Sequence, residues 1–289
     1  MTDWDGRGLP PVAARRVHRA AENGVWTSLL STPAAAGLRV AGLEPVGEVM
    51  GSMVQQMSVT GASCGMYGPG FGGPGFVTVN RTGFDAYAEA LRRGYATAMD
   101  RLGQEAGAIG ADGVVGIDLT TAPVGNGVVE FTALGTAVRA RSAARPGRLF
   151  TTALPGQDVA KLMGAGWLPA ALVFGVAVAV RHDDWQTRAQ ASWGAGNTEV
   201  GGYTQLLVHT RAEARSRFTR HVRQTGADGA IVSSMPLRMW SIEPSENHRD
   251  HVAESLVFGT AVARFAPAPT AARSLTFLPL RQNDSRSRS

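Results

Sequence analysis

The sequence has one cysteine, one lysine and no long hydrophobic run, and each shortage excludes a class of protein. Cys64 alone cannot form an intramolecular disulfide, which favours a reducing, cytoplasmic location. The longest apolar run, residues 170–180, is too short for a membrane span of about 20 helical residues. The first ten residues carry charges where a secretory signal needs an apolar segment. We therefore expect a cytoplasmic protein with no membrane span.

Because Lys161 is the only lysine, the net charge of +5 comes almost wholly from arginine. Arginines gather in the N-terminal segment and in residues 211–223, where they fall at several helical angles. A nucleic-acid surface needs a basic stripe on one face with aromatic residues interleaved. We therefore expect no nucleic-acid partner.

The chain carries matched landmarks in fixed order, which indicates a tandem duplication. Residues 26–28 recur as residues 150–152, an offset of 124, and Gly51 recurs as Gly175 at the same offset. Residues 87–113 match residues 203–229 at an offset of 116, and Gly-Thr-Ala-Val at 135–138 recurs at 259–262. The offset changes only between elements, where loops tolerate insertions.

Each copy predicts the same order of elements. A short strand (25–29; 149–152) and a small helix or turn (33–41; 157–165) precede a long, valine-rich strand (46–57; 170–181). The main helix follows (84–109; 202–225) and ends at Gly110 or Gly226, where glycine can adopt a left-handed cap. Two strands close each unit (114–119 with 128–138; 230–234 with 253–264). The order β-α-β-β predicts an α+β fold, an antiparallel sheet covered by one long helix, twice over.

One helix covers only one face of a sheet. The valines of the long strands indicate that the second face is also apolar, so it must pack on the sister copy or on another chain. We therefore expect a homo-oligomer.

The landmarks resemble the YbjQ family, whose members are labelled heavy-metal-binding domains. The resemblance rests on Pro-Val-Gly-x-Val-x-Gly at residues 45–51, on Gly-Ala-Asp at 110–112 and 226–228, and on the two Gly-Thr-Ala-Val strands. The second copy lacks the Pro-Val-Gly start. The resemblance implies dodecin-like β-α-β-β modules assembled into rings, typically pentamers.

Four matched acidic residues are candidate ligands for a divalent metal ion. Asp112 and Asp228 follow the main helices, where a turn that bonds to backbone N–H groups is the alternative role. Glu130 and Glu254 lie on otherwise apolar strands, where a carboxylate ring could bind hard cations. The alternative for these two is a salt bridge to Arg101 or Arg217, which we favour.

The remaining polar candidates are weaker. His248 and His251 are expected in a solvated loop that only the second copy has. We favour this over a structural zinc site, because such a site needs four N or S ligands. Cys64 has no adjacent histidine and lies in the glycine-rich loop 61–76, which we interpret as a mobile connector without a phosphate-binding motif.

We predict an N-terminal basic segment (1–24), two modules (25–141 and 148–265) and a partly disordered tail rich in Pro, Ala, Ser and Arg (266–289). Within the tail, residues 274–280 are apolar enough to dock as an edge strand on a neighbour. The predicted function is a non-enzymatic, ring-forming homo-oligomeric scaffold. The alternatives are a metal-ion binder using the matched carboxylates, and a flavin-like small-molecule binder or enzyme that would use Trp185, Trp193 and Trp240.

Overall fold

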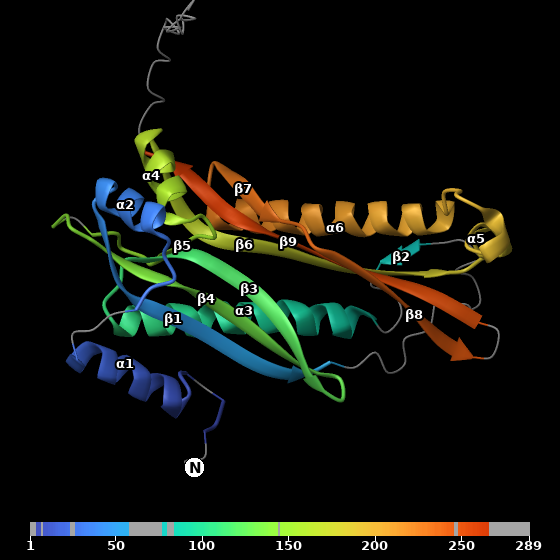
Figure 1. Cartoon of the computed structure of the whole chain (residues 1–289), viewed down its shortest axis with the longest axis horizontal. Coiled ribbons are helices and arrows are strands. Elements are labelled where there is room, and N and C mark those ends of the chain that lie inside the picture. Colours follow the sequence, from blue (N-terminus) through green and yellow to red (C-terminus); the bar gives the residue numbers. More distant parts are fainter. Residues whose placement is uncertain are drawn as a thin grey trace, which may run out of the picture.

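The structure, a computed structural model, describes residues 4–6, 8–23, 27–57, 77–79, 84–143, 145–245 and 248–265. After an N-terminal helix, two α+β units follow one another, each an antiparallel sheet with one long helix (Figure 1). The elements through the first unit are α1 (Pro11–Asn23), α2 (Thr32–Val40), β1 (Leu43–Gln56), β2 (Val77–Val79), α3 (Phe84–Ala108), β3 (Gly113–Gly125) and β4 (Val128–Ala140). Those of the second unit are β5 (Phe150–Thr151), α4 (Gly156–Gly164), β6 (Trp167–His182), α5 (Trp185–Gln190), the 3-10 helix η1 (Trp193–Ala195), α6 (Gly201–Thr225), β7 (Gly229–Ser234), β8 (Leu237–Ser245) and β9 (His248–Arg264).

The two sheets exchange short strands. Sheet 1 has the strand order β1-β4-β3-β5, and sheet 2 has the order β2-β6-β9-β7, with β8 also paired to β9. β5, the start of the second unit, therefore lies at the edge of sheet 1, and β2 from the first unit lies at the edge of sheet 2. β7 and β8 pair with successive parts of β9, where the first unit has the single strand β3.

Local sequence explains where the main elements end. Gly110 and Gly226, which follow α3 and α6, have φ angles of 70° and 73°, as predicted for left-handed caps. Asn126 and Gly127 both have positive φ between β3 and β4, the conformation that Asn-Gly gives to a tight hairpin turn.

The long strands of the two units share one register. Leu43 of β1 pairs with Ala140 of β4, and Trp167 of β6 pairs with Arg264 of β9, each residue 124 positions further along. Both pairings have an irregularity at the matched prolines, Pro45 and Pro169. The helices α3 and α6 each contain 25 residues. The matched sequence landmarks therefore have the same strand register and helix length in both units. This agreement supports the interpretation that the chain is a tandem duplication.

Several expectations for individual elements were wrong. Residues 27–29 form no strand, and the rest of the expected strand 25–29 lies outside the described residues. α1 was not expected in the N-terminal segment. His248 and His251 belong to β9 rather than to a loop, and β8 was missed. Cys64 and its loop 61–76 lie outside the described residues, as does the tail 266–289 with its segment 274–280.

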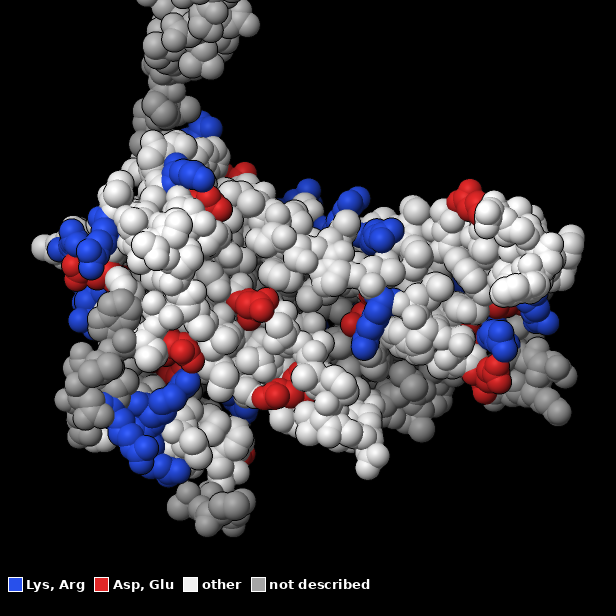
Figure 2. Space-filling model, in the orientation of Figure 1, with Lys and Arg blue, Asp and Glu red and all other residues white. Residues whose placement is uncertain are grey.

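Arginines lie in separate groups on the face shown in Figure 2, with acidic side chains between several of them and no continuous basic stripe. This distribution accords with the expectation of no nucleic-acid partner, which stays a prediction. None of the helices that the structure describes is long and apolar enough to cross a membrane.

Candidate assembly interface

The second unit begins by extending the sheet of the first. β5 pairs in parallel with β3, so that Val114 faces Thr151 in the register. The backbone N–H of Phe150 donates to the carbonyl of Asp112 at 3.1 Å, and that of Thr152 donates to the carbonyl of Val114 at 2.9 Å. This pairing fixes the second unit against the edge of sheet 1.

Two short helices cross at the same junction. A Cβ at Gly37 of α2 would lie 2.6 Å from the Cα of Gln157 in α4, and one at Gly156 would lie 2.3 Å from the carbonyl oxygen of Ala34. Only glycine therefore permits this approach of the backbones. Leu38 of α2 and Val159 of α4 are buried together there, so the contact is a packed one.

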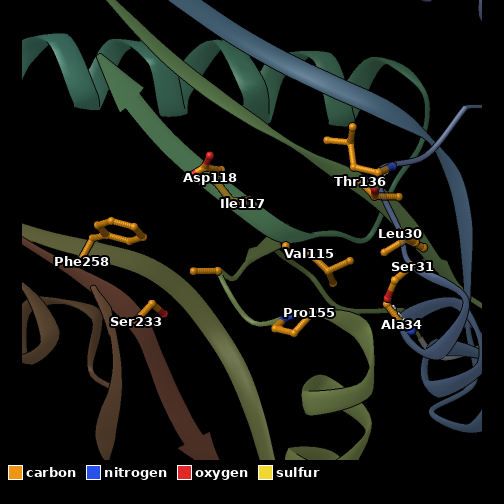
Figure 3. A pocket seen from close by; sticks show the side chains of 13 residues that line it. Leu30, Ser31, Ala34, Val115, Ile117, Asp118, Thr136, Pro155, Ser233 and Phe258 are labelled. Atoms are coloured by element: carbon orange, nitrogen blue, oxygen red, sulfur yellow. Dashed lines mark hydrogen bonds between the residues drawn. The ribbon is translucent and has the colours of Figure 1, made fainter. Parts of the chain in front are cut away.

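A cavity of about 420 Å³ lies beside this junction (Figure 3). It is lined by segments of both units, including Leu30 before α2, Ile117 on β3 and Phe258 on β9. Asp118 is the one titratable side chain among its described lining residues. The other polar side chains in the lining are the hydroxyls of Ser31, Thr136 and Ser233.

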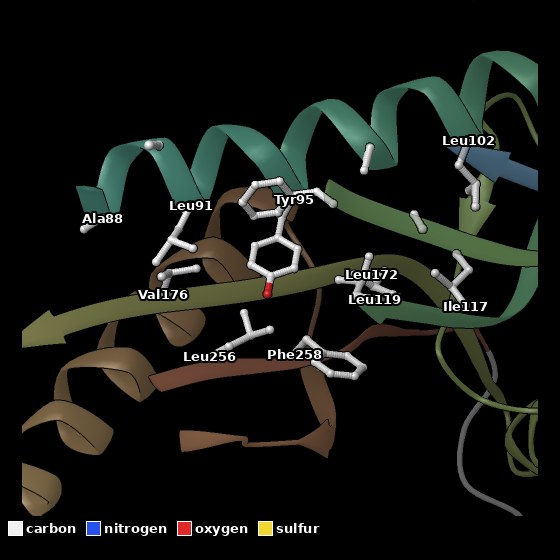
Figure 4. Packing of buried hydrophobic residues seen from close by; sticks show 14 of the residues in the cluster. Ala88, Leu91, Tyr95, Leu102, Ile117, Leu119, Leu172, Val176, Leu256 and Phe258 are labelled. Carbon is white, nitrogen blue, oxygen red and sulfur yellow. The ribbon is translucent and has the colours of Figure 1, made fainter. Parts of the chain in front are cut away.

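A second contact between the units covers one face of sheet 2. Tyr87, Leu91 and Tyr95 of α3 are buried in one cluster with residues of sheet 2. Figure 4 shows Leu91 and Tyr95 beside Val176 of β6 and Leu256 of β9. The ring of Tyr95 lies 5.9 Å from that of Phe174, and the ring of Tyr87 lies 6.1 Å from that of Trp240. The sequence predicted that this second face must pack on something, and in sheet 2 it packs on the sister unit.

Glu254 is bound inside this contact. Its carboxylate accepts a hydrogen bond from the Tyr87 hydroxyl at 3.1 Å and pairs with Arg238 at 2.7 Å. Burial first, and then the charge of Glu254, raises the pKa of Tyr95 to about 12. Burial and Glu254 raise the pKa of Tyr87 as well, so both phenols remain neutral at physiological pH.

The matching face of sheet 1 is open apart from the part that α1 lies over, across a groove. We call the side of β1 and β4 that carries Met50, Ser52, Val54 and Glu130 the outer face of sheet 1. Its counterparts in sheet 2, 124 positions further along, are Phe174, Val176, Val178 and Glu254. Val178 is fully buried beneath the first unit, whereas the side chain of Val54 is 55% exposed.

The edge of β1, and the edge of β6 ahead of its short pairing with β2, are both capped by the main helix of their unit. Arg101 of α3 donates to the carbonyl of Ser52, and Arg217 of α6 donates to the carbonyl of Val176, the matched atom. Glu105 of α3 accepts from the backbone N–H of Met50 at 2.6 Å. Its counterpart on α6 is His221, and the backbone N–H of Phe174 donates to its Nδ1 at 3.2 Å. The helices therefore satisfy backbone groups that an edge strand leaves unpaired.

Those contacts correct the expected salt bridges of the matched glutamates. Arg101 binds a carbonyl, and Arg217 binds a carbonyl and Glu213, whereas Glu254 pairs with Arg238. Glu130 accepts a hydrogen bond from the Ser52 hydroxyl at 2.6 Å. Arg238 lies on β8, the strand that the sequence did not predict.

The matched aspartates each bind the last residue of the closing strand of their unit, β4 or β9. Asp112 accepts a hydrogen bond from the backbone N–H of Ala140 at 2.7 Å, and Asp228 accepts the matched bond from Arg264 at 2.8 Å. Asp112 also pairs with Arg145 at 2.8 Å. Among the described residues, no three His, Cys, Asp or Glu side chains group as a metal site would require. The metal role of the four acids stays a prediction.

We expect Asp112→Asn to lower the free energy of unfolding by about 1 kcal/mol at neutral pH. Burial raises the pKa of Asp112, but the bonds from Arg145 and from the Ala140 N–H outweigh it and lower that pKa overall. The stabilisation is therefore present above the ordinary pKa of about 3.9 and is lost as the pH falls toward the lowered value. Urea titrations of both proteins from neutral to acid pH measure it.

Asp228→Asn is the matched control. Asp228 accepts the corresponding hydrogen bond from the backbone N–H of Arg264, and Arg264 is exposed to solvent. It should cost less than Asp112→Asn at neutral pH. Equal losses in the two variants, or a loss in Asp112→Asn that persists unchanged in acid, would contradict this role of the Arg145 pair.

A histidine–aspartate cluster at the far end of sheet 2 escaped sequence reasoning. His182 Nδ1 lies 2.9 Å from Asp250, and His251 Nδ1 lies 2.9 Å from Asp183, which also accepts from the Tyr203 hydroxyl at 3.3 Å. The alternation of polar residues that is typical of a strand is the sequence signal that could have predicted this cluster. In the folded sheet, His182 pairs with Asp250 in the register.

Comparison with known proteins fits this architecture. The chain is 34% identical to an encapsulin nanocompartment protein of Mycobacterium tuberculosis over 272 residues, which are 91% of this chain and 94% of that protein. This chain belongs to the same family. Residues 75–141, in the first unit, match the YbjQ family model described as putative heavy-metal-binding. The resemblance to the YbjQ family drawn from the sequence is therefore confirmed, and the match includes β4 but not β1.

Proposed function

We propose that the protein is a non-enzymatic, ring-forming subunit of a homo-oligomeric assembly, acting in the cytoplasm as a scaffold component of a protein nanocompartment. One observation supports this most. The outer face of sheet 1 is open in one chain, although its counterpart on sheet 2 is buried under a whole unit. Homo-oligomers satisfy such a face by closed rotational symmetry. The family's mycobacterial member, a nanocompartment protein, supports the assembly role.

The number of copies in the ring is a further part of the proposal. The resemblance to the YbjQ family implies rings of five modules, and with two modules in each chain we propose a pentamer of chains that contains two layers of modules. Native mass spectrometry of the untagged protein measures this directly. A particle of five times the chain mass of 30.3 kDa is expected. Another closed number would contradict only the pentamer.

The same spectrum separates the alternative functions. Asp112 pairs with Arg145, Glu254 pairs with Arg238 and Tyr87, and Glu130 binds Ser52, so a cation would have to displace these partners. We expect no stoichiometric metal in the particle. Zinc bound tightly by the wild type, and lost in His248→Ala with His251→Ala, would instead support the metal-ion binder.

A bound small molecule is tested in the same experiment. Trp185 and Trp193 are fully or largely exposed, and Trp240 packs on Tyr87 instead of lining an open cleft. A site for such a ligand is a concave pocket lined largely by apolar and aromatic side chains. An absorbing ligand that leaves with denaturation would favour the binder or enzyme over the scaffold.

A further inference from the structure

The segment before α2 holds the same position in the first unit that the segment with β5 holds in the second. The backbone N–H of Leu29 donates to Thr136 Oγ1 at 3.1 Å. The matched bond, from Ala153 to Thr260 Oγ1, measures 3.2 Å. All four residues correspond at an offset of 124. Residues 27–30 are therefore placed as residues 151–154 are, but within the described part of the chain they pair with no strand.

The strand that could receive this segment is β7. In the second unit, β7 corresponds to the part of β3 that β5 extends, because Gly113 pairs with Val138 and Gly229 pairs with Val262. Within the described part of the chain, β7 pairs only with β9, so its other edge is unpaired. Val232 on this strand is 55% exposed. An exposed edge of this kind is a template for strand addition.

We propose that copies of the chain join head to tail, with Thr27 and Ser28 of one copy adding a short parallel strand to the free edge of β7 in the next. The contact repeats the pairing of β5 with β3. Thr27 then faces Ala230 as Thr151 faces Val114, and the backbone N–H of Ser28 donates to the carbonyl of Ala230. This inference rests on the proposed homo-oligomer and names the surfaces that form it.

The remaining surfaces of the two copies complement one another in charge and polarity. On α6, Arg211 takes the position that Tyr95 has on α3, and Val208 beside it is 60% exposed. In the repeated contact this helix face meets the outer face of sheet 1, which carries Glu48 and Glu130 together with the exposed Val54. Opposite charges and apolar side chains therefore face each other, as in a specific interface.

The helix α1 lies over part of that receiving face. Arg16 of α1 pairs with Glu105 and approaches Glu48 at 3.9 Å, and a groove of about 600 Å³ separates α1 from Met50 and Val54. None of the side chains described in residues 8–19 is buried. On sheet 2 the matched position is held by α3, whose Arg92 and Met99 line a groove with Phe174. Docking of a second copy therefore displaces a weakly packed helix.

The test removes one backbone donor. Ser28→Pro deletes the N–H that the proposed pairing uses and leaves a buried carbonyl without its partner. We expect the dissociation constant of the assembly, measured by dilution with light scattering on the full chain, to rise at least about tenfold. Two controls should keep the wild-type constant. Ser28→Ala retains the N–H, and Thr27→Pro removes an N–H that points away from the neighbour in a parallel pair.

The outcomes distinguish this inference from the proposed function. A monomeric wild type contradicts the homo-oligomer itself. An oligomeric wild type with unchanged assembly in Ser28→Pro contradicts only the strand addition, provided that circular dichroism shows the variant folded. If Ser28→Pro does not fold, oxidation of the Thr27→Cys, Ala230→Cys double variant in a Cys64→Ser background decides. Covalent multimers that neither single variant forms support the pairing, and their absence in an oligomeric protein overturns it.

Discussion

Gly51→Ala should lower the free energy of unfolding by about 3 kcal/mol, the upper range for overpacking. A Cβ at Gly51 of β1 would lie 1.9 Å from the carbonyl oxygen of Ala98 and 2.5 Å from the amide nitrogen of Leu102. Both atoms belong to the backbone of α3, so the whole helix would have to move. Gly175→Ala should cost a similar amount, because its Cβ would lie 2.3 Å from the carbonyl oxygen of Ala214 on α6.

Urea unfolding followed by circular dichroism measures these effects. Gly103→Ala is the control on α3 itself, since its Cβ would only touch Leu149 at an ordinary 3.8 Å. Replacing a helical glycine there should raise stability by about 0.5–1 kcal/mol. If Gly51→Ala and Gly103→Ala shifted stability alike, the close contact of helix and sheet would be disproved.

The second large effect concerns the contact between the units. Tyr95→Ala should lower the free energy of unfolding by about 3–4 kcal/mol, because a buried aromatic ring leaves a cavity. The Tyr95 ring lies 5.1 Å from that of Phe131 in its own sheet and 5.9 Å from that of Phe174 in the other. Its loss therefore weakens both the packing of α3 and the contact between the units.

Arg211→Ala, the matched change on α6, is the control. Among the described residues, Arg211 makes no hydrogen bond or ion pair with the first unit, so under dissociating conditions its removal should cost less than about 1 kcal/mol. Under assembling conditions it should weaken the oligomer, because the same position then meets a second copy. A large loss of monomer stability in Arg211→Ala would show that α6 is already covered within the chain.

The elements that the sequence predicted have a strong periodicity of apolar residues or end at a clear helix-capping residue. α3 and α6 begin and end within one residue of the predicted bounds, because an apolar stripe defines them and Gly110 and Gly226 end them. The long strands and their order were also predicted. Because the two copies share matched landmarks, each helix and strand could be predicted from both copies. An ambiguous signal in one copy was therefore supported by the other.

The elements that sequence reasoning missed depend on contacts that no local pattern encodes. β8 and the start of β9 alternate polar and apolar residues, and the polar ones find partners such as the pair of His251 with Asp183 only in the folded sheet. Glu254 was singled out correctly as unusual, but its partner Arg238 has no counterpart in the first unit. A strand at residues 27–29 would need an edge to pair with, and no strand in the described part of the chain pairs with them.

The molecular mass in solution tests the central claim most directly. Light scattering of the full-length, untagged protein at low micromolar concentration should give a single species whose mass is a multiple of 30.3 kDa. The partly covered outer face of sheet 1, and the edge of β7 that is unpaired among the described residues, are the surfaces that such a partner would bury. A monodisperse mass equal to one chain, unchanged on concentration, would contradict the account.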